Sequence, residues 1–217
     1  MDGKARAGDV TGGAPPLRTS PPEAERPLDT GTSGTLIRPR REALGEYVAA
    51  LESGWSPANV AGDAVVRAHL AAIGRDADAF LESLHDPEAR GAPIALPDGT
   101  NVPRLPGYTR WIWDGGFCGA VHFRWQPGTA ALPSHVLGHV GYAVVPWKRG
   151  RGHARRALAL LLPEARAVGL PHVDLTTDPE NIASQRVILA QGGYLVERFR
   201  KDAAYGGQEG LLFRIPL

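Results

Sequence analysis

The segment that most constrains the fold of this chain is an apolar, β-branched run that passes directly into a glycine- and arginine-rich turn. It reads Val144-Val145-Pro146-Trp147-Lys148-Arg149-Gly150-Arg151-Gly152-His153-Ala154, and a long helical pattern follows it. Glycine lets the backbone approach an anion closely, and the free N–H groups at the start of a helix point toward that anion. The junction therefore predicts a strand, a turn and a helix whose N-terminus binds a phosphorylated ligand.

Two other kinds of phosphate-binding loop fit this segment poorly. A Walker A loop requires two glycines five residues apart, followed by Lys and then Ser or Thr, and the segment has no such arrangement. A dinucleotide fingerprint requires G-x-G-x-x-G directly after the strand. Gly150 and Gly152 fit it, but Arg155 stands at the third glycine position and residues 146–149 separate the strand from the first glycine. Neither nucleotide hydrolysis nor dinucleotide binding is therefore favoured.

Two ordered motifs in the second half of the chain resemble those of the GNAT superfamily of N-acetyltransferases. Arg149-x-x-Gly152-x-Ala154 resembles the pyrophosphate-binding signature Q/R-x-x-G-x-G/A, and Val144-x-Pro146 resembles the end of the family's fourth strand. Further along, Asn181-Ile182-Ala183-Ser184 and Gly192-Gly193-Tyr194 resemble the family's N-x-x-S…G-[GF] segment. The resemblance covers roughly residues 136–200 and implies the GNAT fold for this chain.

That fold is of the α/β (α+β) class, with a mixed, mostly antiparallel central sheet of about six or seven strands, a splayed fourth strand and flanking helices. Periodicity and turn signals predict strands over 35–38, 108–113, 116–125, 139–145, 172–177, 194–199 and 211–215, and helices over 42–52, from 63, and over 77–84, 152–168 and 181–191. Residues 86–106 are predicted to be a loop. Residues 1–33 are predicted to be a disordered tail that precedes one domain over 34–217, because they are rich in Pro, Gly and charge.

The resemblance implies a set of residues that bind acetyl-CoA. The exposed backbone of the splayed strand, at Ala143, Val144 and Val145, would hold the pantetheine arm, and an N–H near Val145 would stabilise the oxyanion. The pyrophosphate would be held by Arg149 and the N–H groups of Gly150, Arg151, Gly152, His153 and Ala154. Asn181 and Ser184 would meet a distal part of the cofactor. From its own position after Pro179-Glu180, however, Asn181 equally suits a helix N-cap.

The catalytic acid and base are less clearly marked in the sequence. Many relatives have a Glu at the start of the fourth strand, where this chain has His139, so His139 is the candidate base, with His135 and His122 as weaker candidates. The alternative for His139 is a strand histidine bonded to backbone. Relatives often have a Tyr seven residues after the Asn, but Ile188 stands there. Tyr142 or Tyr194 could take the role of the acid, with Tyr142 the named candidate; the alternatives are a packing role for both and protonation of the leaving thiolate by water.

Together these features predict an enzyme that transfers acetyl from acetyl-CoA to a primary amine by direct attack in a ternary complex. The alternative is a non-catalytic acetyl-CoA- or CoA-binding or sensing module. The acceptor would be a small-molecule or peptide amine, and a homodimer is left open. The net charge of +1 gives no reason to expect nucleic acid, and Cys118 is the single cysteine, so neither a disulfide framework nor a bound metal is expected. With no long apolar run or signal peptide, no membrane partner is expected and the protein is predicted to be cytoplasmic.

Overall fold

The computed structural model describes residues 34–58, 62–96 and 99–217, so the tail predicted over 1–33 lies outside the described residues. The helices are α1 (Arg41–Glu52), α2 (Gly62–Arg75), α3 (Ala77–Ser83), α4 (His153–Val168) and α5 (Ile182–Leu189), with short 3-10 helices η1 (Pro146–Lys148) and η2 (Ala203–Tyr205). The strands are β1 (Thr35–Ile37), β2 (His85–Asp86), β3 (Ile94–Ala95), β4 (Asn101–Val102), β5 (Gly107–Trp113), β6 (Phe117–Arg124), β7 (Val140–Val144), β8 (His172–Thr177), β9 (Tyr194–Arg200) and β10 (Glu209–Pro216). Within these ranges no helix is both long and apolar enough to cross a membrane.

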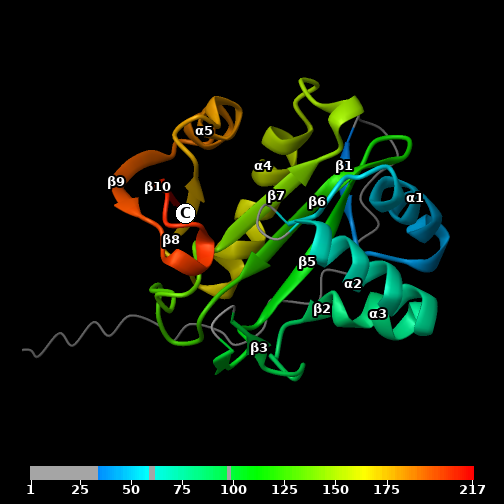
Figure 1. Ribbon diagram of the computed structural model, residues 1–217. Helices are drawn as coiled ribbons and strands as arrows, with labels where there is room; N and C mark the ends of the chain where they lie inside the picture. The colour runs from blue at the N-terminus through cyan, green and yellow to red at the C-terminus, as the bar shows by residue number, and fades with distance from the viewer. Residues whose placement is uncertain (1–33, 59–61, 97–98) are drawn as a thin grey trace, which may run out of the picture.

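Two antiparallel sheets form the centre of the molecule (Figure 1). The first has the strand order β1-β5-β6-β7, with β2 also paired to β5, and the second has the order β8-β10-β9. This arrangement confirms the predicted α/β class and its largely antiparallel sheet. One expectation fails: the segment 86–106, predicted to be a loop, contains the small β3–β4 hairpin. Its strands have two residues each, which is too short for any periodic signal in the sequence.

The two sheets meet at the start of β7. The N–H of His139 donates to the carbonyl of Asp174 over 2.7 Å, which ties the residue before β7 to β8. Gly138 makes this approach feasible, because a Cβ there would lie 2.8 Å from the Asp174 carbonyl oxygen and 3.2 Å from the Cα of Leu175. Beyond this point β7 pairs with β6, whereas β8 pairs with β10. The strand predicted over 139–145 is therefore the splayed strand of the fold.

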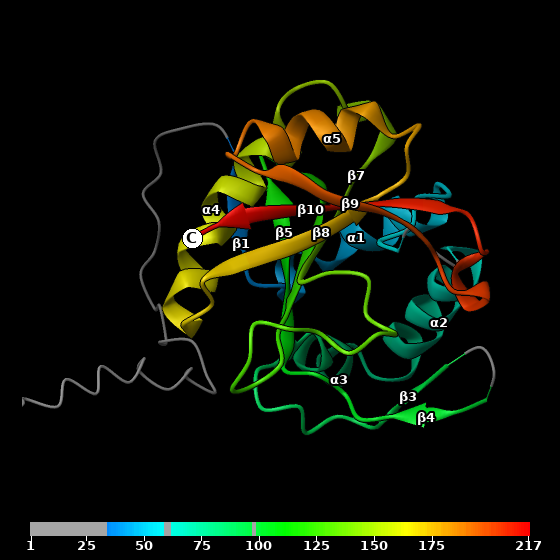
Figure 2. The ribbon, with the colours of Figure 1, turned by 90° about the vertical axis from the view of Figure 1, so that its left-hand side faces the viewer.

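Helices cover both faces of the first sheet (Figure 1). On one face, Leu158 and Leu161 of α4 belong to a core that also contains Phe123 of β6 and strands β8 and β10, so α4 packs against both sheets. Figure 2 shows α4 and α5 beside the β8-β10-β9 sheet. On the other face, α1 packs through Tyr47, whose ring stacks on buried Trp111 of β5 at 4.9 Å. The tryptophans of β5 therefore serve packing.

Candidate active site

The turn between β7 and α4 presents backbone N–H groups that no side chain caps. Gly152 is the N-cap residue of α4 and has φ 81°, in the left-handed region that favours glycine. Gly150 has φ 76°, and a Cβ built on either glycine would meet no atom within 4 Å. The first N–H groups of a helix lack partners within the helix, and the helix dipole adds positive potential there. The turn therefore forms an open cradle with the predicted order of strand, turn and helix, and the binding of an anion in it stays a prediction.

The predicted arginines lie differently around this cradle. Arg149 folds back, because its Nε donates to the carbonyl of Val144 over 3.1 Å. Arg151 and Arg155 are exposed beside the cradle. Arg156 lies elsewhere: a Cβ on Gly34 would be 2.5 Å from its Nη1, so its guanidinium packs against the start of the described chain. Arg151 and Arg155 are thus the side chains best placed to meet a further phosphate.

His153 contributes to the cradle through its backbone alone. Its side chain is buried, its Nδ1 lies 3.9 Å from the Asp114 carboxylate, and burial lowers the pKa of the imidazole. A neutral ring that faces the protein interior does not bind phosphate. The N–H groups of His153 and of Ala154, which follows it in the first turn, remain the groups that can do so.

The backbone of β7 corrects one expectation for the cofactor site. The N–H of Val145 donates to the carbonyl of Cys118 over 3.0 Å, so it is not free to stabilise an oxyanion. Along β7, the backbone N–H and C=O groups of every second residue point toward β6. Ala143, which lies opposite Ala120 of β6, has this orientation, as Val145 does. Val144 has the opposite orientation, and its carbonyl accepts from Arg149 instead. Of the three predicted residues, Val144 is the one whose backbone N–H points away from β6, toward the side on which the sheets diverge.

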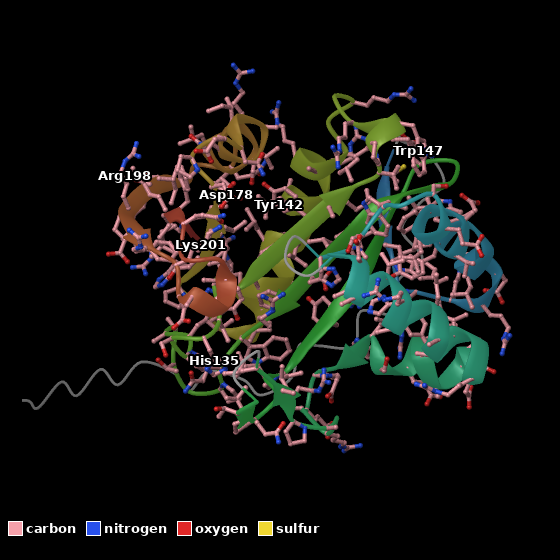
Figure 3. The ribbon with its side chains drawn as sticks, in the orientation of Figure 1. His135, Tyr142, Trp147, Asp178, Arg198 and Lys201 are labelled. Carbon is pink, nitrogen blue, oxygen red and sulfur yellow. The ribbon has the colours of Figure 1, made fainter. Side chains whose placement is uncertain are left out.

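Three predicted residues come together between β7 and α5. The hydroxyl of Tyr142 lies 2.9 Å from the Ser184 hydroxyl, and Figure 3 shows Tyr142 on the side of β7 that faces α5. The side chain of Asn181 accepts a hydrogen bond from the Ser184 N–H over 3.0 Å, so Asn181 is the N-cap of α5. Burial raises the pKa of Tyr142 to about 12, which keeps its hydroxyl protonated and able to donate. Ile188, at the position of the family's tyrosine, is fully buried in the core.

The structure argues against His139 as the catalytic base. Its side chain is 0% exposed, and its Nδ1 accepts a hydrogen bond from the Asp174 N–H over 2.9 Å. Nε2 is buried without a partner in the described part of the chain. Burial lowers the pKa to about 4, so the ring is neutral at physiological pH, but it is sealed from solvent and from any amine. His139 therefore matches the alternative interpretation, a histidine whose ring is hydrogen-bonded to the backbone of a neighbouring strand.

His122 has no free lone pair either. Its Nε2 lies 3.3 Å from the carbonyl of Pro57 and its Nδ1 lies 2.8 Å from the Thr109 hydroxyl. A carbonyl can only accept, so Nε2 must carry the proton and Nδ1 must accept from Thr109. Burial lowers the pKa of His122 to about 4. His122 therefore positions the segment after α1 against the sheet.

Two side chains near the site received no role in the sequence interpretation. Trp147, in η1, is 51% exposed beside the cradle, and Figure 3 places it well away from Tyr142. A large aromatic residue within a polar turn was the available signal. Arg124 lies at the end of β6 on the same face as His122. Its signal was the alternation of His122 and Arg124 with buried apolar residues, which marks a polar strand face.

Comparisons with known proteins agree with this geometry. A family model described as "Acetyltransferase (GNAT) domain" matches residues 70–193. A solved structure of the microcin C7 self-immunity acetyltransferase MccE, in complex with acetyl-CoA and AMP, is 13% identical with a TM-score of 0.56 and covers 86% of this chain and 94% of its own. RimL, a ribosomal L7/L12 α-N-protein acetyltransferase in complex with coenzyme A, is 12% identical with a TM-score of 0.55 and coverages of 88% and 97%. Mycobacterium smegmatis RimJ is 19% identical with a TM-score of 0.55 and coverages of 84% and 81%. No curated protein sequence matches the chain. At these identities the structural likenesses establish the fold alone.

Proposed function

The chain belongs to the GNAT acetyltransferase family, whose domain model covers more than half of it, and on this premise we propose that it transfers acetyl from acetyl-CoA to a primary amine. The amine would attack the acetyl carbonyl directly within a ternary complex. The new C–N bond forms as the C–S bond breaks, the amine loses a proton, and coenzyme A leaves as a thiolate that takes up a proton. The activated thioester is what acetyl-CoA supplies; the chain supplies binding, orientation and hydrogen bonds.

The observation that carries the proposal is the open cradle at the start of α4. Its two left-handed glycines and uncapped N–H groups suit a diphosphate, and Arg151 and Arg155 add positive charge on the solvent side. The backbone of β7 that faces away from β6 would pair with the amide groups of the pantetheine arm, like an added strand. These features lie at the same end of β7, so one extended ligand can use both.

Two groups would act at the reacting atoms. The N–H of Val144 would donate to the oxygen on which negative charge develops. The Tyr142 hydroxyl, held by Ser184, would donate toward the leaving thiolate. Neither His139 nor His122 serves as base in this scheme, because His139 is sealed and both nitrogens of His122 are engaged. The amine therefore enters in its neutral form, and its proton leaves through solvent.

A second candidate function is a module that binds acetyl-CoA without catalysing transfer. The observation that favours it is the loss of both expected catalytic groups, since the base position holds sealed His139 and the acid position holds buried Ile188. Both candidates share the cofactor site. They differ only in whether an amine is acetylated.

An assay of free thiol separates the two candidates. The protein is incubated with acetyl-CoA and a panel of primary amines, and release of coenzyme A is followed with a thiol reagent. The proposed enzyme releases thiol at a rate that depends on the amine and exceeds the protein-free rate by at least about 100-fold. Acetyl-CoA binding without any amine-dependent release would leave the binding module as the function.

A further inference from the structure

Arg124, near the end of β6, has no negatively charged partner in the described part of the chain, and we propose that it binds an oxyanion, carboxylate or phosphate, carried by the acceptor amine. This inference rests on the proposed function, because it concerns the second substrate of the same reaction. It names the acceptor class as small amines with a nearby acidic group.

The position of Arg124 follows from the alternation of β6. Ala120 packs into the core beneath α1, so His122 and Arg124, two and four residues later, share the face covered by α1 to α3. His122 contacts Pro57, in the segment between α1 and α2, which confirms the direction of this face. Tyr142 lies on the opposite face, with α4 and α5. Arg124 therefore lies on the opposite face of the sheet from Tyr142, the residue proposed to donate toward the leaving thiolate.

The hydrogen bonds of Arg124 leave one edge of the guanidinium free. Nη1 donates to the carbonyl of Gly138 over 3.3 Å. In the described part of the chain, Nε and Nη2 have no hydrogen-bond partner, and neither atom is among the polar atoms sealed from solvent. These two N–H groups form the fork that binds a carboxylate or phosphate in a bidentate manner.

Comparable arginines of the two sheets are paired with carboxylates. Arg214 makes two hydrogen bonds to Asp174, and Arg110 lies 3.4 Å from Glu164. Lys201, which is also largely buried, pairs with Asp178, as Figure 3 shows. Arg124 forms no ion pair with any residue in 34–58, 62–96 or 99–217. A partly buried cation without a partner is costly, so an external anion would be bound favourably there.

The backbone next to Arg124 leaves room for such a group. Gly141 of β7 lies opposite His122, on the same face. A Cβ on Gly141 would meet one atom within 4 Å, Nη2 of Arg124 at 3.9 Å. The space above Gly141 is therefore open and is bordered by the free edge of the guanidinium. Gly141 precedes Tyr142 and Val144 by one and three residues, which places this space beside the β7 backbone proposed to hold the thioester.

The electrostatic surroundings also favour an anion. The charge of Arg124 acts on His122 and His139, whose pKa values it lowers together with burial, and Tyr205 also acts on Arg124; none of these three neighbours is a carboxylate. Burial lowers the pKa of the Arg124 guanidinium, which reflects its loss of hydration. Tyr205 is itself fixed, since its hydroxyl donates to the carbonyl of His135. The side chains around Arg124 are therefore held in place by contacts within the protein itself.

The test compares matched amines with and without an acidic group. The pairs are phenylalanine with phenylethylamine, for a carboxylate, and O-phosphoethanolamine with ethanolamine, for a phosphate. With wild-type protein, kcat/KM for the acid-bearing member of at least one pair should exceed that of its neutral partner by about 10-fold or more, the effect of charge-assisted hydrogen bonds. The pair that shows the preference identifies the acid.

Arg124→Gln should abolish this preference by lowering kcat/KM for the acid-bearing amine about 10-fold or more, while the neutral amine is unaffected. Arg124→Lys should retain part of it, since it keeps the charge but not the fork, and it serves as the second variant if Arg124→Gln fails to fold. Arg166→Gln, an exposed arginine near the end of α4, is the control and should keep the preference.

Titration with acetyl-CoA separates this inference from the proposed function. Unchanged acetyl-CoA affinity in Arg124→Gln, with loss of the preference, is the expected result. If acetyl-CoA binds but wild-type protein acetylates no acid-bearing amine, or prefers the neutral partners, the inference is overturned and the cofactor site stands. A preference that survives in both Arg124 variants also overturns it. Failure of wild-type protein to bind acetyl-CoA would overturn the proposed function itself.

Discussion

Two hydrogen bonds between His139 and Asp174 fix the start of β7 against β8, one through the His139 backbone and one through its Nδ1. The Asp174 side chain is in turn held by Arg214 through two hydrogen bonds of 2.8 and 2.9 Å. His139 can accept from the Asp174 N–H only while its ring is neutral. His139, which the sequence suggested as the catalytic base, instead links the two sheets by hydrogen bonds. Because the bond to Nδ1 requires a neutral ring, the protonation state of His139 affects the stability of the fold.

We therefore expect stability to depend on pH through the buried histidines. Unfolded histidines bind protons below about pH 6.5, whereas folded His122 and His139 remain neutral until the pH falls to about 4. The unfolded chain binds more protons in this window, so the free energy of unfolding should fall as the pH is lowered from 6.5 to 4. Denaturant unfolding at several pH values measures the slope. His139→Gln should reduce it, and a slope that this variant leaves unchanged would contradict the assigned environment.

At the scale of elements, local signals in the sequence were sufficient for the strand, turn and helix around the cradle. Gly150, Gly152 and the stripe that includes Leu158 and Leu161 specify local backbone and one buried face. The backbone N–H groups of β7 that point away from β6 could not be predicted from local signals in the same way. Whether Val144 or Val145 points its N–H away from β6 depends on the β6–β7 register, which is a contact between distant parts of the chain.

The junction of β7 with β8 can be tested with two glycines three residues apart. Gly138→Ala should lower the free energy of unfolding by about 1–3 kcal/mol, because the new methyl group would press on the backbone of Asp174 and Leu175. Gly141→Ala is the matched control: its Cβ meets only the end of Arg124 at 3.9 Å, so stability should change by less than about 0.5 kcal/mol. Thermal or denaturant unfolding of both variants gives the comparison. Equal stabilities would mean that the sheets do not meet as closely as described.

At the scale of the whole molecule, the fold class was predictable from the resemblance of two motifs, but the acceptor side was not. The proposed acceptor side would be assembled from the end of β6, Pro57 after α1, and η2, which lie far apart in the chain. None of these segments carries a local motif, and the polar face of β6 becomes informative only when Arg124 is seen to lack a negatively charged partner among the described residues. The β3–β4 hairpin escaped prediction for a similar reason, because its two-residue strands depend on pairing rather than on periodicity.

The central claim is that the cradle at the start of α4 binds acetyl-CoA, and calorimetric titration tests it most directly. Wild-type protein should bind acetyl-CoA with micromolar affinity, about −8 kcal/mol, and should not bind NAD. Gly152→Asp should weaken acetyl-CoA binding by at least about 10-fold, because a carboxylate would enter the cradle. Gly128→Asp is the control, since Gly128 also has a positive φ of 80° and open space around it but lies in the loop between β6 and β7. Loss of affinity in Gly152→Asp alone is the predicted result; equal affinity in both variants, or no binding by folded wild-type protein, would contradict the claim.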